Sequence, residues 1–265
     1  MTISLGFSPC PNDTFIFDAL VNGLIDKDPL EFTLALEDVQ TLNEWAIAGK
    51  LDCTKISYGV LPLVQDNYRL LESGGALGTG VGPLLIARQP VPLEEIPHLR
   101  IAIPGKNTTA HLLFSMAFPD ARKKEFLVFH DIEQAVLDGR ADAGVIIHEN
   151  RFTYAQKGLH KLIDLGEYWE QQLNCPIPLG GIVARKTLPA ETIRQLDRLI
   201  AESIRFSWKQ YPRLSDFIRK HAQEMSEEVM RQHINLYVNE YSQALGPNGH
   251  KAVEQLLVTY KKLQG

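Results

Sequence analysis

His148 directly follows a run of residues typical of a buried strand, in the stretch G-V-I-I-H-E-N-R-F-T-Y from Gly144 to Tyr154. Residues 144 to 147 are apolar, partly β-branched and without alternation, which predicts a strand buried on both faces. The imidazole would then stand at the carboxyl end of that strand, the edge where open α/β sheets bind ligands. Because neutral imidazole has an ordinary pKa of about 6.5, it can accept a proton at physiological pH. We therefore take His148 as a candidate general base, against the alternative of a histidine that only caps a strand.

Polar and aromatic side chains follow His148 without a break. They are Glu149, Asn150, Arg151, Phe152 and Tyr154. A plain connecting loop rarely needs this mixture, whereas a binding site uses both kinds of residue. The composition of the segment therefore favours the functional interpretation of His148.

Lys55 and Ser57 form a second candidate group, at the end of a strand predicted over residues 52 to 56. Side chains two positions apart on a strand point to the same side. Both could therefore face the same ligand crevice as His148. The alternative for Lys55 is an ordinary solvated lysine.

Thr108, Thr109 and Ala110 open a helix that is predicted to run to about Ala117. Two hydroxyls and unpaired backbone N–H groups at a helix N-terminus favour a carboxylate or a sugar oxygen. A simple N-cap would use the same residues, and the two interpretations are compatible.

The start of the chain predicts a strand, a loop and a helix, a unit whose loop also lines a ligand crevice. Residues 4 to 7 are the strand, and S-P-C-P-N-D from Ser8 to Asp13 is a turn-rich loop that ends in two N-capping residues. The helix then covers residues 14 to 24. We take Cys10 as a small packed thiol rather than a reactive one.

Strand and helix patterns alternate along most of the chain, which predicts an α/β fold. The glycine-rich stretch from 74 to 83 resembles a dinucleotide-binding loop only in part, because a strand and not a helix follows it. It fits better as a flexible approach to a strand that crosses between two lobes. A second glycine-bearing strand, 176 to 185, ends in Ala-Arg as residues 82 to 88 do.

These two strands bracket about ninety residues, which predicts two lobes joined by a double crossover. Residues 1–87 and 179–265 would form the first lobe and 88–178 the second, with the substrate cleft between them. From Pro189 onward the pattern is almost wholly helical, so the chain ends in a helical tail. Aromatic residues that recur in this tail at helical spacing are predicted as core: Trp208, Phe217, Tyr237 and Tyr241.

Composition excludes several classes of partner. The chain has 265 residues, a formal net charge of -5 and no run of basic residues, so we expect neither nucleic acid nor an anionic membrane as partner. Three scattered cysteines without a C-x-x-C pair predict no disulfide framework and no zinc site. The first residues lack the pattern of a secretory signal, and no apolar stretch reaches membrane length. We therefore expect a cytoplasmic protein, whose oligomeric state the sequence leaves open.

The alternating elements, the inserted lobe and the helical tail resemble the type-II periplasmic-binding-protein fold, which binds small molecules between two lobes. Five motifs narrow the resemblance: S-P-C-P-N-D-T-F-I-F, T-K-I-S-Y-G, S-G-G-A-L-G-x-G-V-G-P, P-G-K-N-T-T-A and I-I-H-E-N-R-F-T-Y. In this order they are similar to the 1,4-dihydroxy-6-naphthoate synthases of the futalosine route to menaquinone. The likeness runs over nearly the whole chain.

This resemblance implies a carbon–carbon lyase. Such an enzyme acts on cyclic dehypoxanthinylfutalosine, a small spiro compound that joins a sugar remnant to a carboxylated ring system, and releases 1,4-dihydroxy-6-naphthoate. The resemblance implies that His148 is the proton acceptor, and that no redox cofactor or metal is required. It also implies five substrate contacts: Lys55, Ile56, Ser57, Thr109 and Ala110.

Three rival functions are compatible with the same fold. The first is chorismate dehydratase of the same pathway, against which the segment around His148 argues. The second is a solute-binding receptor, which would need a signal peptide and no cleft histidine. The third is the ligand-sensing part of a transcription regulator, which would need a helix-turn-helix before the first strand.

Overall fold

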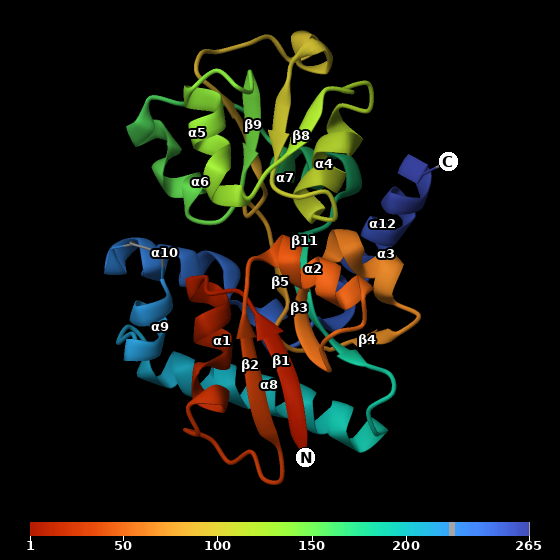
Figure 1. The fold of residues 1–265 in the computed structure, drawn as a ribbon, viewed down its shortest axis with the longest axis vertical. Helices are drawn as coiled ribbons and strands as arrows, with labels where there is room; N and C mark the ends of the chain where they lie inside the picture. Colours follow the sequence, from red (N-terminus) through yellow and green to blue (C-terminus); the bar gives the residue numbers. More distant parts are fainter. Residues whose placement is uncertain (223–225, 265) are drawn as a thin grey trace.

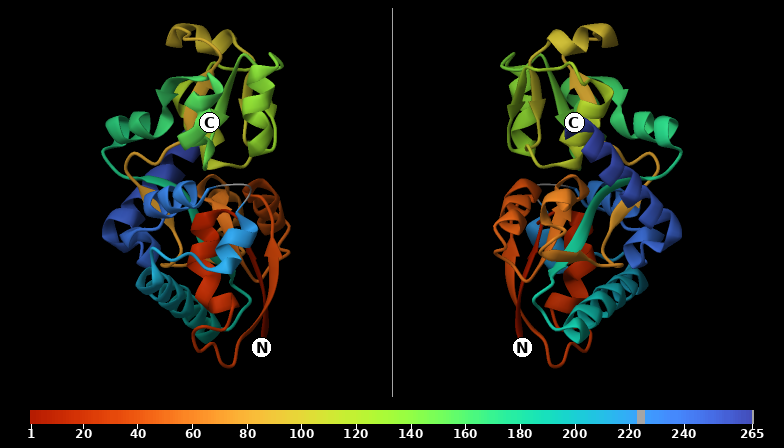
Figure 2. Two further views of the ribbon diagram at one scale, coloured as in Figure 1. Left: turned by 90° about the vertical axis from the view of Figure 1, so that its left-hand side faces the viewer. Right: turned by 90° about the vertical axis from the view of Figure 1, so that its right-hand side faces the viewer.

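Two α/β lobes lie one above the other along the long axis of the molecule, and the chain passes between them twice (Figure 1). The computed structural model describes residues 1–222 and 226–264. The two lobes remain distinct when the molecule is viewed from either side (Figure 2). The two-lobed α/β fold predicted from the sequence is therefore confirmed.

The first lobe is built on a mixed sheet with the strand order β2-β1-β3-β11-β4, and β5 also pairs with β11. Its strands are β1 (Thr2–Phe7), β2 (Glu31–Leu36), β3 (Cys53–Ser57), β4 (Tyr68–Leu70), β5 (Ala76–Gly78) and β11 (Ile177–Arg185). β1 runs parallel to β2 and β3, whereas β11 is antiparallel to β3, β4 and β5. Because β1 and β3 are parallel, the loop after β1 and the end of β3 meet at one edge of the sheet.

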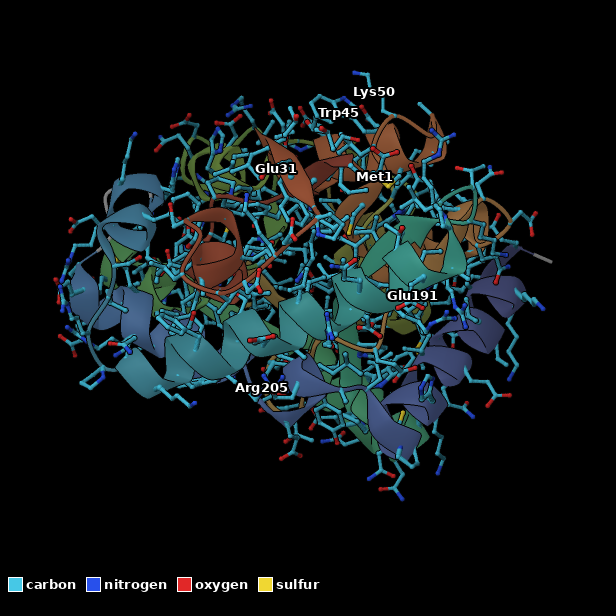
Figure 3. All side chains as sticks on the ribbon, turned by 90° about the horizontal axis from the view of Figure 1, so that it is seen from below. Met1, Glu31, Trp45, Lys50, Glu191 and Arg205 are labelled. Atoms are coloured by element: carbon cyan, nitrogen blue, oxygen red, sulfur yellow. The ribbon has the colours of Figure 1, made fainter. Side chains whose placement is uncertain are left out.

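Helices cover the first lobe, and α1 (Pro11–Val21) packs against α8 (Ala190–Gln210). α8 crosses the underside of the lobe, with Glu191 near its start and Arg205 further along it (Figure 3). Its buried residues recur every three or four positions, as an amphipathic helix requires. The other helices that belong to this lobe or to the tail are α2 (Val39–Ile47), α3 (Leu61–Val64), α9 (Asp216–His221), α10 (Glu227–Tyr237), α11 (Glu240–Gln243) and α12 (Gly246–Gln264).

The second lobe has its own sheet, with the strand order β10-β6-β9-β7-β8. Its strands are β6 (Leu84–Ala87), β7 (Ile101–Ile103), β8 (Lys124–Phe126), β9 (Ala143–Ile146) and β10 (His160–Asp164). Its helices are α4 (Thr109–Ala117), α5 (Ile132–Leu137), α6 (Asn150–Thr153) and α7 (Leu165–Leu173). Among the described residues, no helix of either lobe is long and apolar enough to span a bilayer.

The lobe boundaries differ from those predicted. β6 pairs antiparallel with β9 and β10, so residues 84–87 lie in the second sheet and not in the first. The first crossing therefore falls in the glycine-rich stretch before Leu84. The return crossing precedes β11, which begins at Ile177, two residues before the predicted boundary at 179. The prediction failed at these points because a strand's sheet depends on distant partners that local sequence does not reveal.

Helix α1 begins at Pro11, so Asn12 and Asp13 lie in its first turn and are not the N-caps of a helix starting at residue 14. Proline is favoured at the first helical position, since its ring presets φ and its missing N–H costs no hydrogen bond there. An aspartate in the first turn is also favoured by the helix dipole.

Candidate active site

One cavity between the lobes is lined by the predicted base and by all five predicted substrate contacts. Its empty volume of about 670 Å³ includes space that is open to solvent. The first lobe contributes the loop after β1, the end of β3 and parts of β5 and β11, and the second lobe contributes the start of α4 and the end of β9. The predicted residues that line it are Lys55, Ile56, Ser57, Thr109, Ala110 and His148.

His148 lies two residues beyond β9, where the second sheet faces the cavity. Its backbone has a φ of 57°, in the left-handed region that non-glycine residues rarely adopt. The half-buried imidazole is packed edge-on by the ring of Phe129, whose centroid is 5.2 Å away. Burial lowers the pKa of His148 below its usual value, and Lys55 acts in the same direction, whereas Glu149 and Asp13 oppose the shift. The ring is therefore neutral at pH 7 and able to accept a proton.

The residues after His148 anchor its segment to the rest of the structure. The Asn150 amide donates a hydrogen bond of 2.9 Å to the buried carboxylate of Glu133 on α5. The Arg151 guanidinium forms an ion pair of 2.7 Å with Asp164, and it also donates to the carbonyls of the glycine-rich crossing, at 2.8 Å to Gly80. The polar cluster that the sequence associated with ligand binding thus serves largely to hold the histidine in place.

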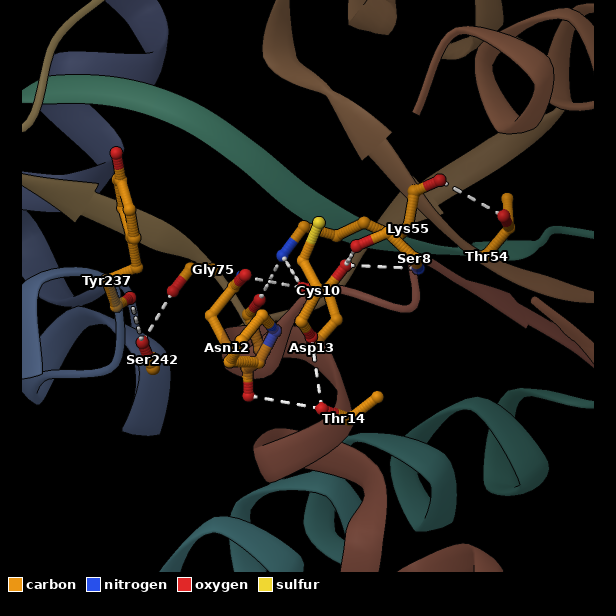
Figure 4. Close-up of polar contacts among 12 residues, drawn as sticks. Ser8, Cys10, Asn12, Asp13, Thr14, Thr54, Lys55, Gly75, Tyr237 and Ser242 are labelled. Carbon is orange, nitrogen blue, oxygen red and sulfur yellow. Dashed lines mark hydrogen bonds and ion pairs between the residues drawn. The ribbon is translucent and has the colours of Figure 1, made fainter. Parts of the chain in front are cut away.

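Lys55 is not a solvated lysine, since its side chain is only 6% exposed and forms a 2.8 Å ion pair with Asp13 (Figure 4). Three other groups donate hydrogen bonds to the Asp13 carboxylate: the Asn12 amide at 2.8 Å, the Ser8 hydroxyl at 2.7 Å and the Ser8 N–H at 3.2 Å. The lysine charge is therefore neutralised within the protein. The pair forms a polar, preorganised wall of the cavity in the first lobe.

Asn12 lines the same wall, and its orientation is set by its neighbour. Because its amide nitrogen donates to Asp13, its carbonyl oxygen must point the other way. That oxygen is buried and accepts no hydrogen bond from the described residues. A ligand with a hydroxyl or N–H donor would supply the missing partner.

The start of α4 meets the first lobe at one end of the cavity. Thr108 is the N-cap, and its hydroxyl accepts a hydrogen bond of 3.2 Å from the N–H of His111. The Thr109 hydroxyl accepts from the N–H of Gly59 at 3.0 Å and donates to the carbonyl of Leu179 at 2.8 Å. It therefore links the lobes, and only the free N–H groups at the helix start remain for a ligand.

Two further features show how closely the lobes approach here. A Cβ atom at Gly59 would lie 2.7 Å from the backbone of Thr108, so any other residue would force this contact apart. Asn43 of α2 bridges the lobes with its side chain, which donates to the carbonyl of Asn107 at 2.8 Å and accepts from the N–H of Ser57 at 2.8 Å. Ser57 is thus fixed by the same contact.

Several residues of the site were missed or misassigned by the sequence analysis. Asn12 and Asp13 were expected to be helix caps, although the S-P-C-P-N-D motif did mark their segment. Tyr237 is buried in the core, as predicted, but it also lines the cavity, which the sequence analysis did not anticipate. Cys10 is buried, and burial raises the pKa of its thiol, which fits the expected packed cysteine.

Comparisons with known proteins assign the chain to a family. The family model for menaquinone biosynthesis matches residues 3–262. The 1,4-dihydroxy-6-naphthoate synthase of Thermus thermophilus is 45% identical over 254 residues, which cover 96% of this chain and 92% of that protein. This chain belongs to the 1,4-dihydroxy-6-naphthoate synthase family.

A second naphthoate synthase, from Streptomyces coelicolor, is 44% identical over 262 residues, covering 97% of this chain and 92% of that protein. The solved structure of AF1704 from Archaeoglobus fulgidus superposes with a TM-score of 0.93 at 32% identity, covering 98% and 97% of the two chains. The periplasmic aliphatic sulphonate binding protein of Escherichia coli superposes with a TM-score of 0.68 at 12% identity, covering 99% and 86%. This last likeness shows the fold alone. The predicted naphthoate synthase family and the periplasmic-binding-protein-like fold are both confirmed.

Proposed function

We propose that this member of the naphthoate synthase family converts cyclic dehypoxanthinylfutalosine to 1,4-dihydroxy-6-naphthoate, with His148 as the general base. The observation that supports this role most directly is the neutral, half-buried imidazole of His148 facing the cavity between the lobes. In the proposed reaction, His148 removes the proton of a hydroxyl on the sugar remnant, and the C–C bond to that remnant breaks as the hydroxyl oxygen forms a carbonyl. The electron pair of that bond enters the ring system, and aromatisation of the naphthalene provides the driving force.

The remaining residues of the cavity suggest how the substrate is oriented. The Lys55 charge is already paired with Asp13, whereas the start of α4 offers the N–H groups of Thr109 and Ala110 at the positive end of the helix dipole, which favours an anion. We place the substrate carboxylate there. The wall formed by Asn12 and Ser57 would then receive the hydroxyls of the sugar remnant. Positioning of this kind between two closed lobes also excludes water.

The deciding experiment is to incubate the purified protein separately with cyclic dehypoxanthinylfutalosine and with chorismate, and to follow products by mass-resolved chromatography. Formation of dihydroxynaphthoate from the first compound alone would support the proposal. Loss of water from chorismate would instead identify a chorismate dehydratase. No product from either, together with tight binding of a small carboxylate, would identify a receptor. The cytoplasmic location stays a prediction, which fractionation of the native host would test.

Replacing Asn12 by alanine should raise the KM for the substrate about 3- to 10-fold, with a smaller effect on kcat. The reason is that one neutral hydrogen bond from a substrate hydroxyl would be lost. Steady-state kinetics test this. Asn22→Ala is the matched control, since Asn22 hydrogen-bonds to Asp18 on the same helix and does not line the cavity. Equal KM values for the two variants would contradict a role for Asn12.

Replacing Thr109 by valine should weaken substrate binding about 5- to 30-fold, because the buried Gly59 N–H and Leu179 carbonyl would both lose their partner. The closed arrangement of the lobes becomes less favourable, although the hydroxyl itself does not need to contact the substrate. Thr109→Ser retains the hydroxyl and should bind nearly as well as the wild type. Calorimetric titration of both variants tests this, and an unchanged Kd for the valine variant would refute it.

A further inference from the structure

His233 is a fully buried histidine with no role in the function described so far. It lies on α10 in the C-terminal tail and is 0% exposed. Neither ring nitrogen forms a hydrogen bond with any described residue. Buried polar atoms are almost always paired, and unpaired ones lower stability, so a histidine kept in such a place calls for an explanation.

The ring of His233 lies beside that of His148, across the boundary between the lobes. Their centroids are 5.8 Å apart, and the ring planes are inclined by 31°. α10 follows the edge of the first lobe that faces the second (Figure 1). On its other side His233 packs edge-on against Tyr237, at 4.7 Å between centroids. The two rings are not hydrogen-bonded here, so a direct bond between them requires both a reorientation and a closer approach of the rings.

His148 needs an orienting partner. No described group forms a hydrogen bond with its ring, and the other aromatic ring near it, Phe129, can pack but cannot accept a proton. In most enzymes a histidine base is oriented by a carboxylate or a carbonyl that accepts its second N–H. Of the two acidic groups nearby, Asp13 is already occupied by its four donors. Glu149 forms no hydrogen bond with the His148 ring, and one of its carboxylate oxygens is buried without a partner among the described residues.

His233 is suited to accept that hydrogen bond. Burial lowers its pKa well below the usual value, and the nearby His148 and Lys55 act in the same direction. It therefore stays neutral over the working pH range, and a neutral imidazole carries one unprotonated nitrogen. A neutral acceptor orients the base without the strong upward shift in pKa that a buried carboxylate would cause.

We propose that His233 is the positioning residue of the catalytic base: its unprotonated nitrogen accepts the N–H of His148 and stabilises the imidazolium formed when His148 takes up the substrate proton. This inference rests on the proposed role of His148. Since the two histidines come from different lobes, the pair forms only when the lobes are closed. Closure of the lobes over the substrate would therefore bring His233 and His148 together as a hydrogen-bonded pair.

The test compares His233→Phe, which keeps a ring for packing but removes both nitrogens, with His233→Gln, which offers an amide oxygen as acceptor. We expect the phenylalanine variant to lose about 10- to 100-fold in kcat with little change in KM. The glutamine variant should recover part of that loss. If His233 serves only to fill space, the phenylalanine variant will keep the wild-type kcat, and that result would overturn the proposal.

The pH dependence of kcat/KM gives an independent readout. In the wild type the acid limb should lie below pH 6.5, since the lowered pKa of His148 keeps it neutral to lower pH. Loss of the acceptor in His233→Phe should move the limb to still lower pH, because the protonated form of His148 loses its stabilisation. The charged and titratable groups that face the two rings, Glu149, Asp13, Lys55 and Tyr237, are the same in both proteins. An unmoved acid limb would contradict the proposal.

Two controls keep the outcomes distinct. If His233→Phe does not fold, as judged by circular dichroism, the same comparison is made between His233→Gln and His233→Met, which are similar in size and differ in the acceptor. Equal kcat values for that pair would overturn the proposal. His148→Asn is measured alongside: an active His148→Asn variant would refute the base itself, whereas an inactive one together with a fully active His233→Phe would refute only the role of His233.

Discussion

Replacing His148 by asparagine should lower kcat by about 10²- to 10⁴-fold, the range that general-base catalysis contributes, while substrate binding changes little. Asparagine is the appropriate substitution because residue 148 has a φ of 57°, a conformation that asparagine tolerates better than most other residues. The variant should therefore fold normally, with the interlobe contacts at Thr109 and Asn43 intact.

Single-turnover kinetics on His148→Asn separate chemistry from binding and product release. His130→Asn is the matched control, because its exposed imidazole lies on the same lobe and does not line the cavity. It should retain the wild-type kcat. A His148→Asn variant that also kept its kcat would show that another group, or the substrate itself, removes the proton.

The sequence predicted those residues of this site whose position follows from a local pattern, such as the end of a strand or the start of a helix. His148 could be placed at a strand end because four apolar residues precede it. Lys55 and Ser57 could be placed on one side of a strand because side chains alternate there. Thr109 was recognised at a helix start, although its hydroxyl turned out to join the lobes.

The residues that were missed depend on contacts between distant parts of the chain. Tyr237 and His233 lie on a helix whose apolar spacing predicts only that one face is buried, and the same spacing results whether that face meets a core or a cleft. Likewise β6 has the composition of any buried strand, and its sheet is decided by pairing with β9 and β10. Local sequence therefore identified the position of the cavity better than it identified the residues that we propose to support the base.

The ion pair between Asp13 and Lys55 leads to the largest expected effect on stability. Asp13→Asn would leave the buried Lys55 cation without its counter-charge. It would also place an amide N–H donor against the Ser8 hydroxyl or the Asn12 amide, which are themselves donors here. The variant should therefore destabilise the protein by about 3–5 kcal/mol.

Urea denaturation tests this, and Glu31→Gln is the control. Glu31 pairs with Lys27 at the same 2.7–2.8 Å separation but on the surface, and its loss should leave the unfolding midpoint nearly unchanged. The double variant Asp13→Asn with Lys55→Met should lose less than the sum of the two single variants, because it removes both charges together. Additive losses would mean that each group is stabilised mainly by its other neighbours, so that Ser8 and Asn12, rather than Lys55, hold the carboxylate in place.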